Sequence, residues 1–201
     1  MRRRIKSSSR STRESTLRRG FTLAEVLVTV AIVSLLAAVM IPAVAGQLSK
    51  GDVGRVEADL SNIRSGIEAF LSDVHRYPAR VSDLTKSVTG NNDILGNAYP
   101  AALSTKWKGP YMQQDTVTFS GSTGAGLPTA LGGTIINAFE KFTNAANTTD
   151  YVTVRIVGLT VADFNKIDAD IDGVVNQTGG SLRFKTGTTV DTIKYLAIPI
   201  Q

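Results

Sequence analysis

The chain has 201 residues, with 22 Lys and Arg against 17 Asp and Glu, which gives a formal net charge of +5 at pH 7. It contains no cysteine, which excludes disulfides and a cysteine nucleophile. The one histidine, His75, lies beside Arg76, and no catalytic Ser-His-Asp set can be built without it. We therefore expect a protein that is not an enzyme.

The charge is distributed unevenly along the chain. Residues 1–20 carry eight basic residues and one acidic residue, a net charge of +7, whereas the remaining residues carry a net charge of −2. The basic character thus belongs to a serine- and arginine-rich start, which has the composition of a processing segment. The charge therefore does not imply binding of nucleic acid.

Residues 21–45 form an apolar run of 25 residues. As a helix the run is about 37 Å long, which exceeds the roughly 30 Å hydrocarbon core of a bilayer. Its only charge is Glu25, and charged residues inside such segments are rare and usually functional. Thr29 and Ser34 can bond back to the helix backbone, and Pro42 should kink or loosen the helix.

The basic flank gives the orientation, because basic segments next to a membrane span stay in the cytoplasm. We expect a single span through membrane lipid, with the N-terminus in the cytoplasm of the inner membrane. The rest of the chain is then exported.

A short motif surrounds the junction between the basic and apolar segments: Arg18-Arg19-Gly20-Phe21-Thr22-Leu23-Ala24-Glu25. It resembles the class III leader of type IV pilins and of type II secretion pseudopilins. The resemblance implies cleavage by a prepilin peptidase after Gly20 and methylation of the new N-terminal Phe21. It also implies that Phe21 and Glu25 take part in assembly with identical subunits, through inner-membrane assembly machinery.

Two other interpretations of the apolar run remain open. Ala43-Val44-Ala45 fits a general signal peptidase site, with cleavage before Gly46. The run can also be a membrane anchor that is never cut. In that case Glu25 has a local role, because Thr22-x-x-Glu25 fits a capping box at the start of a helix.

Residues 46–77 continue as an amphipathic helix that ends at Tyr77-Pro78. One apolar stripe at three- and four-residue spacing predicts its buried face: Val53, Val56, Leu60, Ile63, Ile67, Phe70, Leu71 and Val74. Helix breakers gather in residues 42–54, namely Pro42, Gly46, Gly51 and Gly54. This segment is either a weak section that melts when subunits pack or a hinge at the membrane exit.

Residues 78–201 predict one small head domain. Strands are expected at 151–157, 181–185 and 193–200, with a weaker one at 116–119. Residues 135–142 are expected to form a short helix, and 89–92 and 120–126 are expected to form turns. The predicted fold class is α+β, a long N-terminal helix packed on a small antiparallel sheet.

Two short segments near the helix end resemble the major pseudopilin of type II secretion. These are Tyr77-Pro78, and Trp107 followed by Gly109-Pro110-Tyr111. Aromatic loop residues packed on the helix would explain the same residues. The C-terminal third is longer than in that family and departs from it.

Three alternating aspartates and a glycine, Asp168, Asp170, Asp172 and Gly173, resemble the first half of a calcium loop. Asn176 could add an oxygen, but Gly179 stands where a bidentate glutamate is needed. The alternative is a helix that starts at Thr160-x-x-Asp163 and runs through Ile167, with the aspartates in a solvated helix end and turn. Ca²⁺ is the one candidate cofactor.

Together these features predict a structural subunit that polymerises through its N-terminal helix into a pilus-like filament at the cell surface. A pseudopilin of a type II secretion system is the alternative of the same class. A membrane-anchored extracytoplasmic binding module is the alternative of another class.

Overall fold

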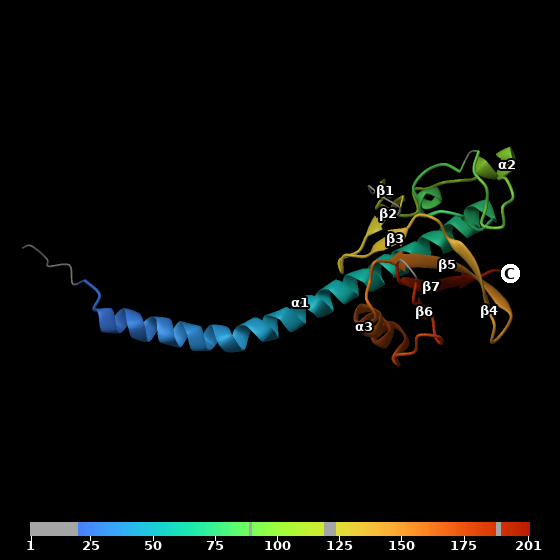
Figure 1. The fold of residues 1–201 in the computed structure, drawn as a ribbon. Coiled ribbons are helices and arrows are strands. Elements are labelled where there is room, and N and C mark those ends of the chain that lie inside the picture. The colour runs from blue at the N-terminus through green and yellow to red at the C-terminus, as the bar shows by residue number, and fades with distance from the viewer. Residues whose placement is uncertain (1–19, 89, 119–123, 188–189) are drawn as a thin grey trace, which may run out of the picture. The chain divides into compact units, whose positions relative to one another are not determined.

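The computed structural model describes residues 20–88, 90–118, 124–187 and 190–201. The chain divides into two compact units, Met1–Ala45 (unit 1) and Gly46–Gln201 (unit 2). The division falls inside the first helix, α1 (Leu23–Val74), which belongs to both units (Figure 1). Most of the predicted leader lies outside the described residues.

In unit 1 the apolar side chains of α1 are exposed. Leu23 is 81% exposed and Leu35 71%, and Phe21, just before the helix, is 89% exposed. Among the described residues, α1 is the one helix long and apolar enough to cross a membrane. Thr29 Oγ1 donates to the carbonyl of Val26 at 2.8 Å, and Ser34 Oγ to that of Val30 at 2.7 Å. The predicted return of these hydroxyls to the backbone is therefore confirmed.

Helix α1 runs without a break through Pro42 and through residues 42–54. Proline removes one backbone donor, and here the helix continues on both sides of it. Melting of this section upon subunit packing stays a prediction. The helix ends at Val74, where His75 adopts a left-handed backbone with φ 56° and donates its N–H to Leu71 O at 2.9 Å. The end therefore comes three residues before the predicted Tyr77.

Unit 2 contains a seven-stranded antiparallel sheet of order β1-β2-β3-β5-β7-β6, with β4 also paired to β5. The strands are β1 (Val117–Thr118), β2 (Ala125–Pro128), β3 (Thr134–Ile136), β4 (Glu140–Asn144), β5 (Thr149–Val157), β6 (Leu182–Lys185) and β7 (Thr192–Pro199). The other elements are η1 (Val81–Leu84), α2 (Ala101–Ser104) and α3 (Val161–Asp172). The predicted α+β class, with a long helix and an antiparallel sheet, is confirmed.

The predicted helix at 135–142 is wrong. Its first part belongs to strand β3 and its last part to strand β4. The segment contains the β-branched pair Ile135-Ile136 and two phenylalanines, which favour strands, and periodicity over so few residues does not separate helix from strand. Strand β2 also occupies the end of a segment predicted as a turn. There Gly126 lets the backbone of Ile135 approach too closely for any side chain.

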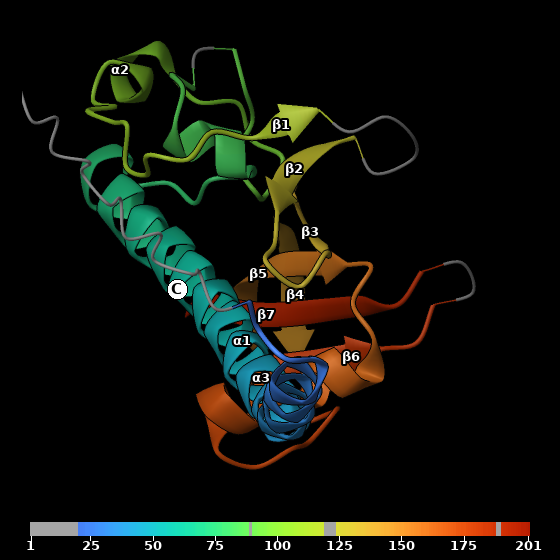
Figure 2. The same cartoon turned by 90° about the vertical axis from the view of Figure 1, so that its left-hand side faces the viewer.

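The core of unit 2 lies between α1 and one face of the sheet (Figure 2). The predicted stripe on α1 is buried: Val53, Val56, Leu60, Ile63, Ile67, Phe70 and Val74 are at most 2% exposed, and Leu71 packs at the edge. Gly66 lies in the same stripe, and a Cβ there would lie 3.2 Å from Leu84 Cδ1. A small residue at this position thus lets η1 pack tightly on α1.

Candidate functional site

The segment around Gly20 and Phe21 precedes the first turn of α1. Both residues lie outside the helix, and both are exposed. The bond between them is therefore accessible in an irregular segment, as a peptidase requires. The assignment of Gly20 and Phe21 as the processing site stays a prediction.

Glu25 closes a capping box at the start of α1. Its Oε2 accepts hydrogen bonds from the N–H of Thr22 and from Thr22 Oγ1, both at 2.9 Å. The N–H of Glu25 in turn donates to Thr22 Oγ1 at 3.2 Å. The carboxylate thus satisfies free donors at the helix N-terminus, where negative charge is also favourable. This contact is local and leaves open a second role for the charge.

The three candidate calcium aspartates lie at the end of α3 rather than in a loop, and Asn176 follows the helix. Thr160 caps this helix through a capping box with Asp163, as the Thr160-x-x-Asp163 pattern predicts, and α3 continues to Asp172. Gly173 then ends it with a left-handed φ of 74°. The helix is thus longer than the predicted end at Ile167.

The aspartates of α3 do not converge on one point. Asp168 and Asp172 are one helical turn apart and share a face, whereas Asp170 is exposed. Burial raises the pKa of Glu57 on α1, and the Asp170 carboxylate raises it further. Asn176 uses its side-chain oxygen within its own turn, accepting from the N–H of Thr178 and of Gly179 at 3.0 Å. The described residues hold no group of three or more His, Cys, Asp or Glu side chains that could bind a metal ion.

Asp168 and Asp172 instead hold the segment after α3. Asp168 Oδ2 accepts the N–H of Asn176 at 2.7 Å, and Asp172 Oδ2 accepts those of Ser181 and Leu182 at 2.6 and 3.2 Å. Burial raises the pKa of Asp168, and the nearby Asp172 carboxylate raises it further, against the Asn176 hydrogen bond. Oδ1 of Asp168 is buried without a hydrogen-bond partner among the described residues. Calcium binding stays a prediction.

The aromatic motif residues pack at the C-terminal end of α1. Trp107 Nε1 donates to Asp83 O at 2.9 Å, and Tyr111 Oη donates to Asp73 Oδ2 at 3.0 Å. The Tyr111 ring meets those of Phe70 and Trp107 edge-on, each with centroids 5.7 Å apart. The structural explanation of this motif, loop aromatics on the helix, is therefore confirmed.

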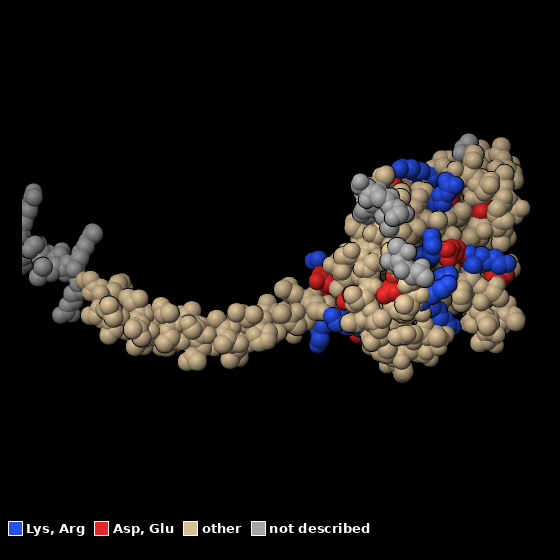
Figure 3. All heavy atoms as spheres, viewed as in Figure 1, with Lys and Arg blue, Asp and Glu red and all other residues tan. Residues whose placement is uncertain are grey.

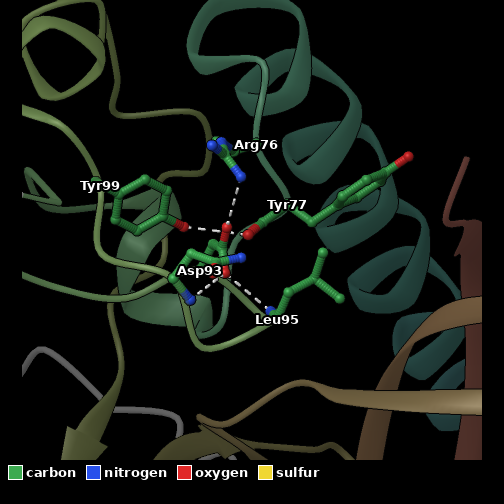
Figure 4. Close-up of polar contacts among 6 residues, drawn as sticks. Arg76, Tyr77, Asp93, Leu95 and Tyr99 are labelled. Carbon is green, nitrogen blue, oxygen red and sulfur yellow. Dashed lines mark hydrogen bonds and ion pairs between the residues drawn. The ribbon is translucent and has the colours of Figure 1, made fainter.

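Two buried carboxylates that the sequence did not indicate hold the loops beside this helix end. Asp93 Oδ1 accepts the N–H of Leu95 and of Asn97 at 2.9 and 2.8 Å, and Arg76 Nη1 donates to Asp93 Oδ2 at 3.3 Å (Figure 4). Tyr99 Oη donates to the carbonyl of Tyr77 at 3.1 Å in the same cluster. A single aspartate in a turn-rich segment carries no pattern that would reveal its burial.

Asp83 is the second of these carboxylates and is 1% exposed. Its Oδ2 accepts the N–H of Ala79 and of Arg80, both at 3.1 Å, and its Oδ1 accepts Asn91 Nδ2 at 3.1 Å. Burial raises the pKa of Asp83 despite these hydrogen bonds. Asp83 and Asp93 thus hold the loops of unit 2 in place beside the end of α1.

Comparisons with known proteins cover part of the chain. Residues 16–41 match the prokaryotic N-terminal methylation motif. The chain is 32% identical over 71 residues to type II secretion system core protein G of Pectobacterium carotovorum subsp. carotovorum, which is 35% of this chain and 46% of that protein. It is 39% identical over 57 residues to type IV major fimbrial protein FimA of Dichelobacter nodosus, which is 28% of this chain and 36% of that protein.

The chain thus spans less than half the length of these curated relatives. No solved structure matches the chain. The chain therefore carries the prepilin-type methylation motif at residues 16–41 and is similar, over 71 and 57 residues, to a type II secretion protein and a type IV fimbrial protein.

Proposed function

We propose that this protein is a pilin-like structural subunit that polymerises into a type IV pilus-like filament through its N-terminal helix after cleavage between Gly20 and Phe21. The observation that carries the proposal is the methylation motif at residues 16–41, directly before and within a membrane-length helix whose apolar side chains are exposed. A helix with this surface needs lipid or other helices around it. When subunits leave the membrane, a filament surrounds the helix with the helices of other subunits.

Before assembly the subunit is held in the inner membrane by unit 1, with the basic segment in the cytoplasm. Prepilin peptidase is the partner that removes this segment, and inner-membrane assembly machinery then extracts the subunit. After assembly the head is exposed on the outer side of the cell.

We expect Glu25 to act when subunits assemble into the filament. Cleavage creates a positive α-amine at Phe21, four residues from the carboxylate. Both charges are costly to hold in an apolar filament core unless they are paired. The amine of a neighbouring subunit can pair with Glu25 and so fix the axial register between subunits.

A pseudopilin of a type II secretion system is the second candidate. Its support is the similarity to core protein G, together with the Trp107-to-Tyr111 segment. Surface filaments in the sheared cell fraction would favour the pilus. Loss of protein secretion in a deletion strain that keeps its surface filaments would favour the pseudopilin.

The mass of the mature N-terminus tests the processing step. We expect a chain that begins at a methylated Phe21, and we expect Gly20→Leu to retain the leader, because the larger side chain blocks the cleavage position. Gly20→Ala is the milder comparison and should be cut in part. A mature chain that starts at Gly46 would show an ordinary signal peptide. A wild-type chain that retains Met1 would show an uncut anchor, as in a membrane-anchored binding module.

A further inference from the structure

Three basic side chains form a row across the middle of the unit 2 sheet. Strand register places Lys194 of β7 opposite both Arg155 of β5 and Arg183 of β6. Their neighbours along each strand are buried in the core: Val154, Ile156, Leu182, Phe184, Ile193 and Tyr195. Since side chains alternate between the faces of a strand, the row lies on the face that points away from α1.

The row has more positive charge than its surroundings neutralise. Glu140 of β4 pairs with Arg155 at 3.0 Å and with Lys194 at 2.9 Å. Among the described residues, neither Arg183 nor Lys185, which lies two residues further along β6, has an ion pair. The Nε atoms of Arg155 and Arg183 are buried and have no hydrogen-bond partner among those residues. Figure 3 shows Lys and Arg on the visible face of unit 2, with Asp and Glu among them.

Without a bound anion, the repulsion between these cations destabilises the fold. Like charges directly opposite each other on neighbouring strands destabilise a sheet. Burial raises the pKa of Asp168, and Arg183 is near enough to oppose this shift, but Asp168 is fully buried and forms no ion pair with Arg183 among the described residues. An incoming anion would relieve the repulsion.

Two adjoining hollows follow the row. One has a volume of about 390 Å³ and is lined by Glu140, Arg155, Lys185, Thr186, Thr192 and Lys194. The other, of about 370 Å³, is lined by Arg183, Lys185 and Lys194 together with Phe142, Asn144 and Gln177. Lys185 and Lys194 line both, so the hollows form one continuous surface, and their lining holds four cations and one carboxylate.

The polar lining indicates the class of ligand. Arginine presents a planar fork of donors that matches carboxylate, phosphate and sulfate groups. Side-chain amides and threonine hydroxyls suit the hydroxyl groups of sugars. The ring of Phe142 is covered by Lys194, whose Nζ lies 5.5 Å from the ring centroid. That ring is therefore a poor platform for the base stacking on which single-stranded nucleic acid binding depends.

We propose that this outer sheet face, built around Arg155, Arg183, Lys185 and Lys194, binds an acidic oligosaccharide whose carboxylates occupy both hollows. The site belongs to unit 2 and does not depend on cleavage or on polymerisation. Unit 2 would then bind this ligand in the single subunit as well as in the filament.

Calorimetric titration of the full-length chain in detergent micelles tests the proposal. The probes are a short oligomannuronate, a neutral manno-oligosaccharide and a single-stranded oligonucleotide of equal charge. We expect binding of the oligomannuronate and no measurable binding of the neutral sugar. Arg183→Gln and Lys185→Gln should each weaken binding by about tenfold, because each removes a charged contact without disturbing the pairs of Glu140.

Lys106→Gln is the matched control, because Lys106 is exposed and lines neither hollow. It should leave the affinity unchanged, and none of the three variants should melt at a lower temperature than the wild type. Equal or tighter binding of the oligonucleotide would overturn the proposal in favour of nucleic acid or of unspecific charge attraction. Self-association that is lost in Lys185→Gln, without sugar binding, would overturn it in favour of a second copy of the chain.

Discussion

The two units of this chain use their apolar residues in opposite ways. In unit 2 the apolar stripe of α1 is buried by the sheet, and Phe70 and Ile63 are fully buried. In unit 1 the same helix exposes Leu27 to 63% and Leu36 to 59%. Unit 2 thus contains its own core, whereas unit 1 depends on surroundings that the chain itself does not supply.

This contrast separates the effects expected from mutation. A change in unit 1 should affect insertion, processing and assembly while the head stays folded. A change in the core of unit 2 should affect folding first.

The largest expected effect is the loss of filaments from Glu25→Ala. We expect insertion, cleavage and a folded head, with a filament yield lower on the order of tenfold or more, because the α-amine of Phe21 loses its charged partner. The yield is measured in the sheared surface fraction of a strain without the wild-type subunit.

Glu25→Gln distinguishes the charge from the helix cap. Glutamine can take the same place in a capping box, so it should keep the contacts with Thr22 and still fail to assemble. Thr22→Ala is the converse variant, which loses the two hydroxyl hydrogen bonds of the cap and keeps the charge, and it should assemble better than either. Normal yield from Glu25→Gln would reduce Glu25 to a helix cap.

The second prediction compares two apolar truncations in the same helix. Phe70→Ala should lower the free energy of unfolding of unit 2 by about 3–5 kcal/mol, because it leaves a cavity beside Tyr99 and Tyr111. Leu27→Ala should leave that free energy unchanged. Denaturant unfolding of both variants in detergent, followed by the fluorescence of Trp107, measures the difference. An equal loss from both would show that the units are not independent.

The features of this fold that depend on local sequence patterns can be predicted from the sequence alone. The α1 stripe, strands β5 to β7 and the start of α3 follow from periodicity and capping patterns. Strands β3 and β4 do not follow from the sequence, because the short apolar run around Ile135 fits both periods and its pairing with β5 is a long-range choice. The motif at Gly20 and Phe21 can be read from the sequence because it is local. The basic row cannot, because Arg155, Arg183 and Lys194 come together only through strand register.

The third prediction concerns calcium at the end of α3. If Asp168 and Asp172 bind the ion in the native state alone, a hundredfold excess over Kd raises stability by about 2.7 kcal/mol. The full-length chain in detergent should then melt at a higher temperature in calcium than in chelator, and Asp168→Asn should abolish the difference. Asp163→Asn is the control on the same helix. A melting temperature that does not change at millimolar calcium would remove the metal from the description.

The smallest expected effect is a pH dependence that arises from Asp83. Because burial raises the pKa of Asp83 in the folded state, the folded chain binds its proton more tightly than the unfolded chain does. The contribution of Asp83 to stability is therefore fully present below its unfolded pKa of about 3.9 and is lost as pH rises through the raised folded value.

The sign can be measured against Asp83→Asn, which does not titrate. On acidification from neutral pH, the wild type should gain stability relative to this variant, by less than about 1.4 kcal/mol for each unit by which the two pKa values differ. Denaturant unfolding at a series of pH values gives the difference directly. A wild type that loses stability relative to Asp83→Asn on acidification would mean that the hydrogen bonds from Ala79, Arg80 and Asn91 outweigh burial. Asp83 would then act as a stabilising anion in the loop beside α1.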